Sequence, residues 1–312
     1  MRFTKLFAAV LCSLAALAAS GQNLRDEIAA NPGKSGGVYY VYTYDNPVLT
    51  PAPKGYKPFY ISHYGRHGSR WLLHDSEYDE VMAVFRAADA ANAFTERGRE
   101  VYGRVKRVYD DGIDRGGDLS PLGAEQHREI AARMYRNFPE VFRSGAVVDA
   151  QATLVVRCVL SMAAFCERLK ELNPRLEVSR TAGRRTTRYL NFYSKPTNPT
   201  LSREYLDFID KGGWQEEYER IGDRFVRPGR LMSELFADGE FVRTIDAQKL
   251  MKGLFYFAAD MQNVGLGISF YDLFTTDELY GLNVYDNYKY YVIRGPSPLN
   301  RRFPQYYAKA LL

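Results

Sequence analysis

The stretch "YISHYGRHGSRW", residues Tyr60–Trp71, joins an apolar, β-branched beginning to a cluster of imidazole and guanidinium groups. Two of the four histidines of the chain, His63 and His67, lie within it. An apolar run that leads into glycine and charge is typical of a buried strand that ends at the carboxyl edge of an α/β sheet. The loop after such a strand presents side chains and backbone N–H groups to an anion. We therefore expect a strand over residues 59–65 and an anion site directly after it.

The charged half of this stretch has the residues that phosphate chemistry needs. Arg66 and Arg70 lie on either side of His67. Their planar guanidiniums fit phosphate oxygens, and a neutral imidazole can attack phosphorus directly. We predict that His67 is a nucleophile and that the two arginines bind phosphate; the other interpretation is a basic surface turn. His63 alternates with His67 along the expected strand, so it either supports the site or packs nearby.

The rest of the chain is predicted to alternate strands and helices up to about residue 199 and to be mostly helical after that. Periodicity and composition place strands at 36–44 and 146–154 and helices at 77–90, 95–111 and 155–172. Ser120 as N-cap and Pro121 as first helical residue predict the start of a further helix. Thr275 and Glu278 have the spacing of a capping box at the start of another.

The two ends of the chain suggest export and an early stop. Residues 1–20 have the basic start, short apolar run and small-residue cleavage site of a secretory signal, so we expect a periplasmic or secreted protein without a membrane span. The final residues, 301–312, begin a helix that has no capping signal, and we expect a truncated product or fragment. The predicted domains are a signal peptide at 1–20, the first part of an α/β core at 21–199, a helical inserted domain at 200–291 and a return toward the core at 292–312.

Charge and cysteine content limit the partners. The formal net charge is +5, or about +3 once Arg2 and Lys5 are removed with the signal, which is too mild to argue for nucleic acid and fits a small anionic substrate. Cys158 and Cys166 would lie roughly 12 Å apart on one helix, too far for a disulfide, and are expected in the core. The histidines and cysteines do not have the spacing of metal ligands, so no cofactor is predicted.

Three blocks of the sequence together resemble the histidine acid phosphatases. Arg66, His67, Gly68 and Arg70 match that family's Arg-His-Gly-x-Arg motif, although Leu72 stands where proline is common. The block "LSPLGAEQH" is similar to a second motif through Leu119, Ser120, Gly123 and Gln126, and "ATLVVRCVLSMAAFCERL" to a third through Thr153, Arg157 and Ser161. The segments around 36–70 and 271–287 look most like the multiple inositol polyphosphate phosphatases and phytases.

The resemblance implies a fold and a reaction. The fold would be a phosphoglycerate-mutase-like central sheet flanked by helices, with a mostly helical inserted domain. The reaction would be hydrolysis of phosphomonoesters, above all inositol polyphosphates, through a phosphohistidine and without a metal. The resemblance also makes Arg157 a third arginine that binds phosphate.

One part of the family's pattern has no counterpart here. The family places a late His-Asp or His-Ala-Glu motif in the site, and its carboxylic acid protonates the leaving group, but this sequence has no histidine after His127. The proton donor is therefore unknown, and the alternative is a pseudoenzyme that binds polyanions or an inactive fragment.

Three further residues are assigned by general arguments. Arg184 and Arg185 belong to a basic run that is either a solvated face or a wall for a highly phosphorylated substrate. His127, on the helix after Ser120, is interpreted as structural. The sequence does not indicate an oligomeric state.

Overall fold

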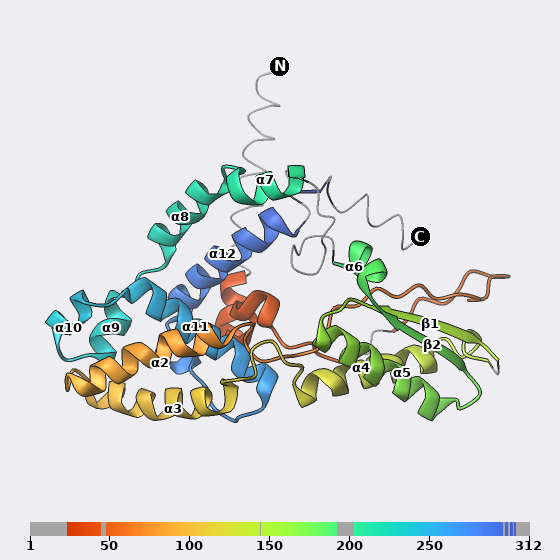
Figure 1. Cartoon of the computed structure of the whole chain (residues 1–312), viewed down its shortest axis with the longest axis horizontal. Coiled ribbons are helices and arrows are strands. Elements are labelled where there is room, and N and C mark those ends of the chain that lie inside the picture. Colours follow the sequence, from red (N-terminus) through yellow and green to blue (C-terminus); the bar gives the residue numbers. More distant parts are fainter. Residues whose placement is uncertain are drawn as a thin grey trace, which may run out of the picture.

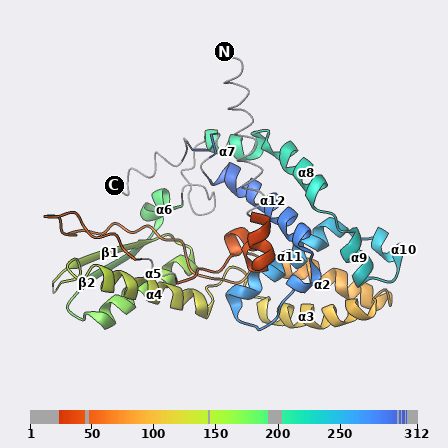
Figure 2. The ribbon, with the colours of Figure 1, turned by 180° about the vertical axis from the view of Figure 1, so that it is seen from behind.

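The computed structural model describes residues 24–44, 48–143, 145–191 and 203–295, together with Ser297, Pro298, Asn300, Arg301 and Phe303. They form a helical lobe and a smaller α/β lobe, which lie side by side in both views (Figures 1 and 2). A mixed α/β architecture was predicted, and it is confirmed.

The α/β lobe is built around two parallel strands. β1 (Val147–Ala152) pairs with β2 (Glu177–Ala182) in a register that places Val147 opposite Glu177. The connection is the helix α5 (Val156–Leu172), as parallel pairing requires a long crossover. α4 (Pro121–Asn137) packs on α5, and the short α6 (Arg184–Leu190) follows β2. The small core between helices and sheet contains Ala131, Phe142, Leu169 and Leu176.

The helical lobe has the larger core. Its long helices are α2 (Asp75–Ala90), α3 (Glu96–Gly112), α11 (Ala247–Val264) and α12 (Thr276–Ile293). Its shorter elements are η1 (Pro32–Tyr39), α7 (Arg203–Lys211), α8 (Trp214–Phe225), α9 (Gly229–Leu235), α10 (Gly239–Arg243) and η2 (Tyr271–Leu273), and residues 24–30 are helical as well. Fully buried aromatic side chains such as Phe85, Phe257 and Phe270 fill this core. Burial of each such side chain contributes about 2 to 3 kcal/mol to folding.

The packing of α2 and α3 differs from the grouping that the sequence analysis expected. These helices were placed with the α/β core, but they share the core of the helical lobe with α9 and α11. The boundaries proposed at residues 199 and 291 otherwise stay predictions.

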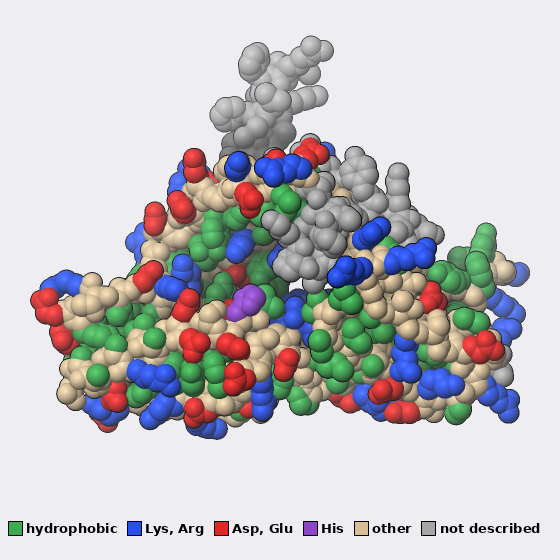
Figure 3. Space-filling model, viewed as in Figure 1, with side chains coloured by type: hydrophobic (Ala, Val, Ile, Leu, Met, Phe, Trp, Pro, Cys, Tyr) green, Lys and Arg blue, Asp and Glu red, His purple; other side chains and the backbone are tan. Residues whose placement is uncertain are grey.

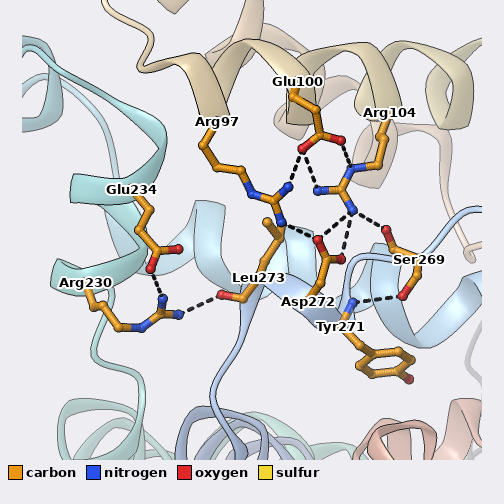
Figure 4. Close-up of polar contacts among 9 residues, drawn as sticks. All are labelled: Arg97, Glu100, Arg104, Arg230, Glu234, Ser269, Tyr271, Asp272 and Leu273. Atoms are coloured by element: carbon orange, nitrogen blue, oxygen red, sulfur yellow. Dashed lines mark hydrogen bonds and ion pairs between the residues drawn. The ribbon is translucent and has the colours of Figure 1, made fainter.

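Ion pairs fix α3 to the loop that follows α11 (Figure 4). Asp272 of η2 accepts from Arg104 at 2.8 Å and also from Arg97, and Arg104 donates to the carbonyl of Ser269 at 2.6 Å. Burial opposes the charge on Asp272, but the bonds to these arginines prevail and lower its pKa. Arg230 of α9 donates to the carbonyl of Leu273 at 2.6 Å, so the same turn is fastened from two sides.

Two predicted strands are wrong. Residues 36–44 are not a strand, because η1 covers their first part and Gly37 has a φ of +54° that turns the chain out of an extended course. Residues 59–65 belong to no strand within the described part of the chain, and Phe59 and Tyr60 are largely exposed. A β-branched, aromatic composition produces a strand only where a neighbouring strand takes up its backbone hydrogen bonds.

The local signals for helix starts are confirmed. Ser120 caps α4 by accepting from the amide of Gly123, with Pro121 in the first turn, and Thr275 and Glu278 form a reciprocal capping box on α12. Cys158 and Cys166 both lie on α5 as free thiols, and Cys166 is buried. No helix in the described part of the chain is long and apolar enough to span a bilayer. The predicted signal peptide and residues 304–312 lie outside the described residues.

Candidate active site

A cavity of about 800 Å³ is walled by both lobes and contains the segment that the sequence analysis singled out. Residues 37–43 form one side, His63 and residues 65–70 a second, and α4 of the α/β lobe a third; Asn263 of α11 contributes from the helical lobe. In the space-filling view a histidine is exposed on the helical lobe beside the junction of the two lobes, with both basic and acidic side chains around it (Figure 3).

His67 is held in one orientation and one tautomer. Its Nδ1 lies 2.8 Å from the carbonyl oxygen of Gly68. Because a carbonyl oxygen only accepts, Nδ1 must carry the proton in the neutral ring, and the lone pair is then on Nε2. Nε2 is therefore the nitrogen available for attack on an electrophile.

The surroundings of His67 keep its ring neutral. Burial is the largest cause, and the positive charges of Arg66, Arg157 and Arg70 act in the same direction; together they lower the pKa of His67 to about 3. The hydrogen bond to Gly68 opposes this only in part. At neutral pH the site thus combines an uncharged nucleophile with fixed positive charge, which suits attack on an anionic phosphate ester.

The predicted phosphate-binding arginines surround this ring in different ways. Arg66 and Arg70 line the cavity; Arg66 donates to the carbonyl of Val38 at 2.9 Å, and Arg70 is buried over the ring of Tyr39. Arg157, on α5, donates to the carbonyl of Gly117 at 3.2 Å. Arg157 is not among the residues that line the cavity, but its positive charge helps to lower the pKa of His67.

The basic pair proposed as a wall lies elsewhere. Arg184 and Arg185 are exposed at the start of α6 and do not line the described cavity. The positive charge that α4 brings to the cavity comes from Arg133 instead, which contacts the ring and hydroxyl of Tyr42. No sequence pattern separated Arg133 from the many other arginines on helix surfaces.

Two other histidines, His63 and His127, also line the cavity. His63 stacks on Phe165 with 5.6 Å between ring centroids, and His127 lies 3.1 Å from the carbonyl oxygen of Arg66. Burial lowers the pKa of both. The contact of His127 with the main chain agrees with its interpretation as a structural residue.

The backbone after His67 touches the start of α4 through two glycines. A Cβ atom on Gly68 would lie 2.2 Å from the carbonyl oxygen of Gly123, and a Cβ on Gly123 would lie 2.1 Å from that of Ser69. The amide of Gly68 donates to Ser161 of α5 at 3.1 Å, and that of Ser69 donates to Gln126 of α4 at 2.8 Å. The three sequence blocks therefore meet at one loop, which their positions in the sequence did not require.

Asn263 fastens the same loop to the helical lobe. The hydroxyl of Ser69 donates to its Oδ1 at 2.7 Å, and its Nδ2 donates to the carbonyl of Tyr39 at 2.9 Å. Its own carbonyl accepts from the hydroxyl of Ser120 at 2.7 Å. Sequence reasoning missed this residue, since an asparagine inside an apolar helix pattern carries no local signal for such a role.

The chain has relatives of similar fold among solved structures. The sequence matches no family model and no curated protein sequence. Among solved structures it is similar to the multiple inositol polyphosphate phosphatase of Bifidobacterium longum in complex with inositol hexasulfate, with a TM-score of 0.71 and 17% identity over 88% of this chain and 74% of that one. The chain shares the fold of that enzyme. The phosphate complex of the same enzyme gives a TM-score of 0.69 and 17% identity over 87% of this chain and 71% of that one.

Replacing Asn263 with alanine should weaken the site as well as the fold. The change removes the acceptor of Ser69 and the donor to Tyr39, so we expect the free energy of unfolding to fall by about 2 kcal/mol and kcat/KM for a phosphate ester by about tenfold. Asn283→Ala is the matched control, because Asn283 is also buried and bonds the carbonyl of Ser35, and neither of these residues lines the cavity. Equal losses of kcat/KM in both variants would contradict a specific role for Asn263.

Proposed function

We propose that this chain is an exported phosphomonoester hydrolase of the histidine acid phosphatase family that acts through a phosphohistidine. The observation that carries the proposal is a neutral His67, with its lone pair on Nε2, among the charges of Arg66, Arg70 and Arg157. The fold shared with the Bifidobacterium enzyme supports it. No metal is part of the proposed reaction.

The reaction follows from the roles of these residues. Arg66 and Arg70, which line the cavity, bind the phosphoryl oxygens and offset their charge. Nε2 of His67 then forms a bond to phosphorus while the bond to the ester oxygen breaks, and the departing alkoxide takes up a proton. Water cleaves the phosphohistidine in the second step, which releases inorganic phosphate and restores the neutral ring.

We also propose that the substrate is an inositol polyphosphate. The cavity is much larger than one phosphate group, and Arg133 adds a further positive charge to its lining. Both features suit a substrate with several phosphates.

The residue that would donate a proton to the leaving group is not assigned. Within the described part of the chain, the residues that line the cavity include neither aspartate nor glutamate. That observation favours a second candidate, a protein that binds polyanions without turnover. General acid help is typically worth about 10² to 10⁴ in rate, so an aryl phosphate, whose leaving group needs little of it, is the most sensitive test substrate.

Trapping of the covalent intermediate tests the proposal. Purified protein is mixed with a ³²P-labelled aryl phosphate and quenched in alkali, which preserves phosphohistidine. Wild type should become labelled and His67→Ala should not. His74→Ala is the matched control, because His74 is exposed at the start of α2 and does not line the cavity, so it should label like wild type. Label that survives in His67→Ala would refute the assignment, and binding of inositol hexakisphosphate without any label would favour the second candidate.

A further inference from the structure

A carboxyl group that the proposed reaction does not use is buried in the helical lobe. Asp260, on α11, has no exposed surface. Neither of its carboxyl oxygens has a hydrogen-bond partner of good geometry among the described residues, although the amide of Leu72 favours its charged form. Burying such a group without a partner is costly, and an apolar side chain would avoid that cost. A reason for an acid at this position must come from its neighbours.

The neighbour that matters is Arg70 of the cavity. Its guanidinium is buried, lies 5.1 Å from the centre of the Tyr39 ring and donates from Nη1 to the carbonyl of Trp71 at 2.6 Å. Its Nε is buried without a partner of good geometry in the described residues. Asn263, one turn further along α11 than Asp260, bonds Ser69 and Tyr39, the neighbours of Arg70, so α11 brings Asp260 into the same buried region as the guanidinium. Each of the two groups stabilises the charged form of the other.

We propose that Asp260 is a positioning residue for Arg70 and that anion binding at Arg70 is linked to protonation of Asp260. This inference rests on the function proposed above, since it takes Arg70 to bind the phosphate. An ionised Asp260 attracts the guanidinium from behind, whereas a bound dianion attracts it from the cavity and repels the carboxylate. The two negative groups compete for one cation, so the anion binds more tightly when Asp260 is protonated.

The protonation of Asp260 falls within an accessible pH range. Burial is the main cause that raises its pKa to about 8, Arg70 acts in the opposite direction, and Glu77 of α2 adds to the rise. The other titratable groups that interact with it or with Arg70 are three tyrosines and a histidine: Tyr78 of α2, Tyr39 of η1, Tyr290 of α12 and His67. Burial raises the pKa of the three phenols above their ordinary value and lowers the pKa of His67 to about 3. Asp260 is thus the member of this group that changes charge near pH 8.

The sign of the effect follows from linkage. Binding of an anion raises the pKa of Asp260 further, so complex formation takes up protons near pH 8 and not near pH 6, where the group is already protonated. If the rise is about one unit, the uptake at pH 8 is about 0.4 proton per site, and the Kd of the anion increases by roughly fivefold between pH 6 and pH 9.

Calorimetry with inorganic sulfate measures this linkage directly. Sulfate keeps its charge from pH 6 to pH 9, so any protons taken up on binding are bound by the protein and supplied by the buffer. Titrations at each pH in two buffers of different ionisation enthalpy give the number of protons bound. We expect uptake at pH 8 for wild type and none for Asp260→Asn, whose Kd should also be independent of pH. Asp286→Asn is the matched control, because Asp286 is a second buried acid of the helical lobe with a raised pKa, but it accepts from Tyr256 at 2.9 Å.

The outcomes separate this inference from the proposed function. Sulfate binding to wild type without proton uptake at pH 8 would overturn the role of Asp260, and this result needs no variant. Uptake in Asp260→Asn equal to that of wild type would overturn it as well. Sulfate that fails to bind wild type at pH 6, or that binds Arg66→Ala equally well, would show that the proposed anion site is wrong, and the inference would fall with it.

Discussion

Replacing His67 with asparagine should lower kcat for an aryl phosphate by on the order of 10⁴-fold or more, because the variant has no nitrogen lone pair with which to attack phosphorus. Asparagine is close in size to the ring, and the arginines around it stay in place. The KM of the substrate should therefore change much less than kcat. Steady-state kinetics with chromogenic release of a phenol measures both.

The pH profile of wild type checks the same assignment independently. Burial and the neighbouring arginines lower the pKa of His67 to about 3 in the folded protein, whereas its ordinary value is 6.5. The nucleophile of the free protein therefore stays neutral down to about pH 3, and kcat/KM should not lose activity on its account above that pH. An acid limb of kcat/KM near pH 6.5 that persists when each of the other histidines is replaced would contradict the lowered pKa of His67.

The free energy of unfolding should fall on acidification over the same range, although the nucleophile stays neutral. Between pH 6.5 and about 3 the unfolded chain binds a proton on His67 that the folded chain excludes, so the free energy of unfolding falls as the pH falls. The lowered pKa values of His63 and His127 act in the same direction. Short assays with circular dichroism at each pH distinguish loss of the nucleophile from unfolding, and His67→Asn should lose less stability on acidification than wild type does.

The predictions that succeeded depended on neighbouring residues in the sequence. Ser120 accepts from the amide three residues on, and Thr275 and Glu278 bond each other across one helical turn, so their roles are decided locally. His67, Arg66 and Arg70 meet in one cavity largely because they lie within five residues of each other. The strand at β1 was also recognisable from its composition and the helix that follows it, whereas its partner β2 was not predicted.

The predictions that failed depended on partners far away in the chain. Residues 59–65 have a strand's composition, but no described strand pairs with them, so their composition alone did not decide their structure. Asn263 and Asp260 acquire their neighbours only when α11 packs beside residues 39–72. Helix periodicity predicts which side of α11 carries Asn263 and Asp260. It does not predict which side chains from distant parts of the sequence pack against that side.

Replacing Gly68 with alanine should cost about 3 kcal/mol or more of the free energy of unfolding and abolish turnover. The added methyl would lie 2.2 Å from the carbonyl oxygen of Gly123, and backbone cannot move aside as a flexible side chain can. Any shift of the loop also disturbs the amide of Gly68, which donates to Ser161. Gly123→Ala should behave alike, because its methyl would meet the carbonyl oxygen of Ser69 at 2.1 Å. Thermal unfolding and aryl phosphate turnover measure the two effects.

Gly103 provides a control that distinguishes the steric clash of an added methyl from the general effect of replacing a glycine. Gly103, inside α3, has nothing within 4 Å of the position of an added Cβ, so Gly103→Ala should stabilise the protein by about 0.5 to 1 kcal/mol through its better helix propensity. If Gly68→Ala matched Gly103→Ala in stability and wild type in turnover, the loop after His67 would not be held against α4. If Gly68→Ala instead has a lower Tm and no activity, then the backbone contact between Gly68 and Gly123 is what fixes the position of His67.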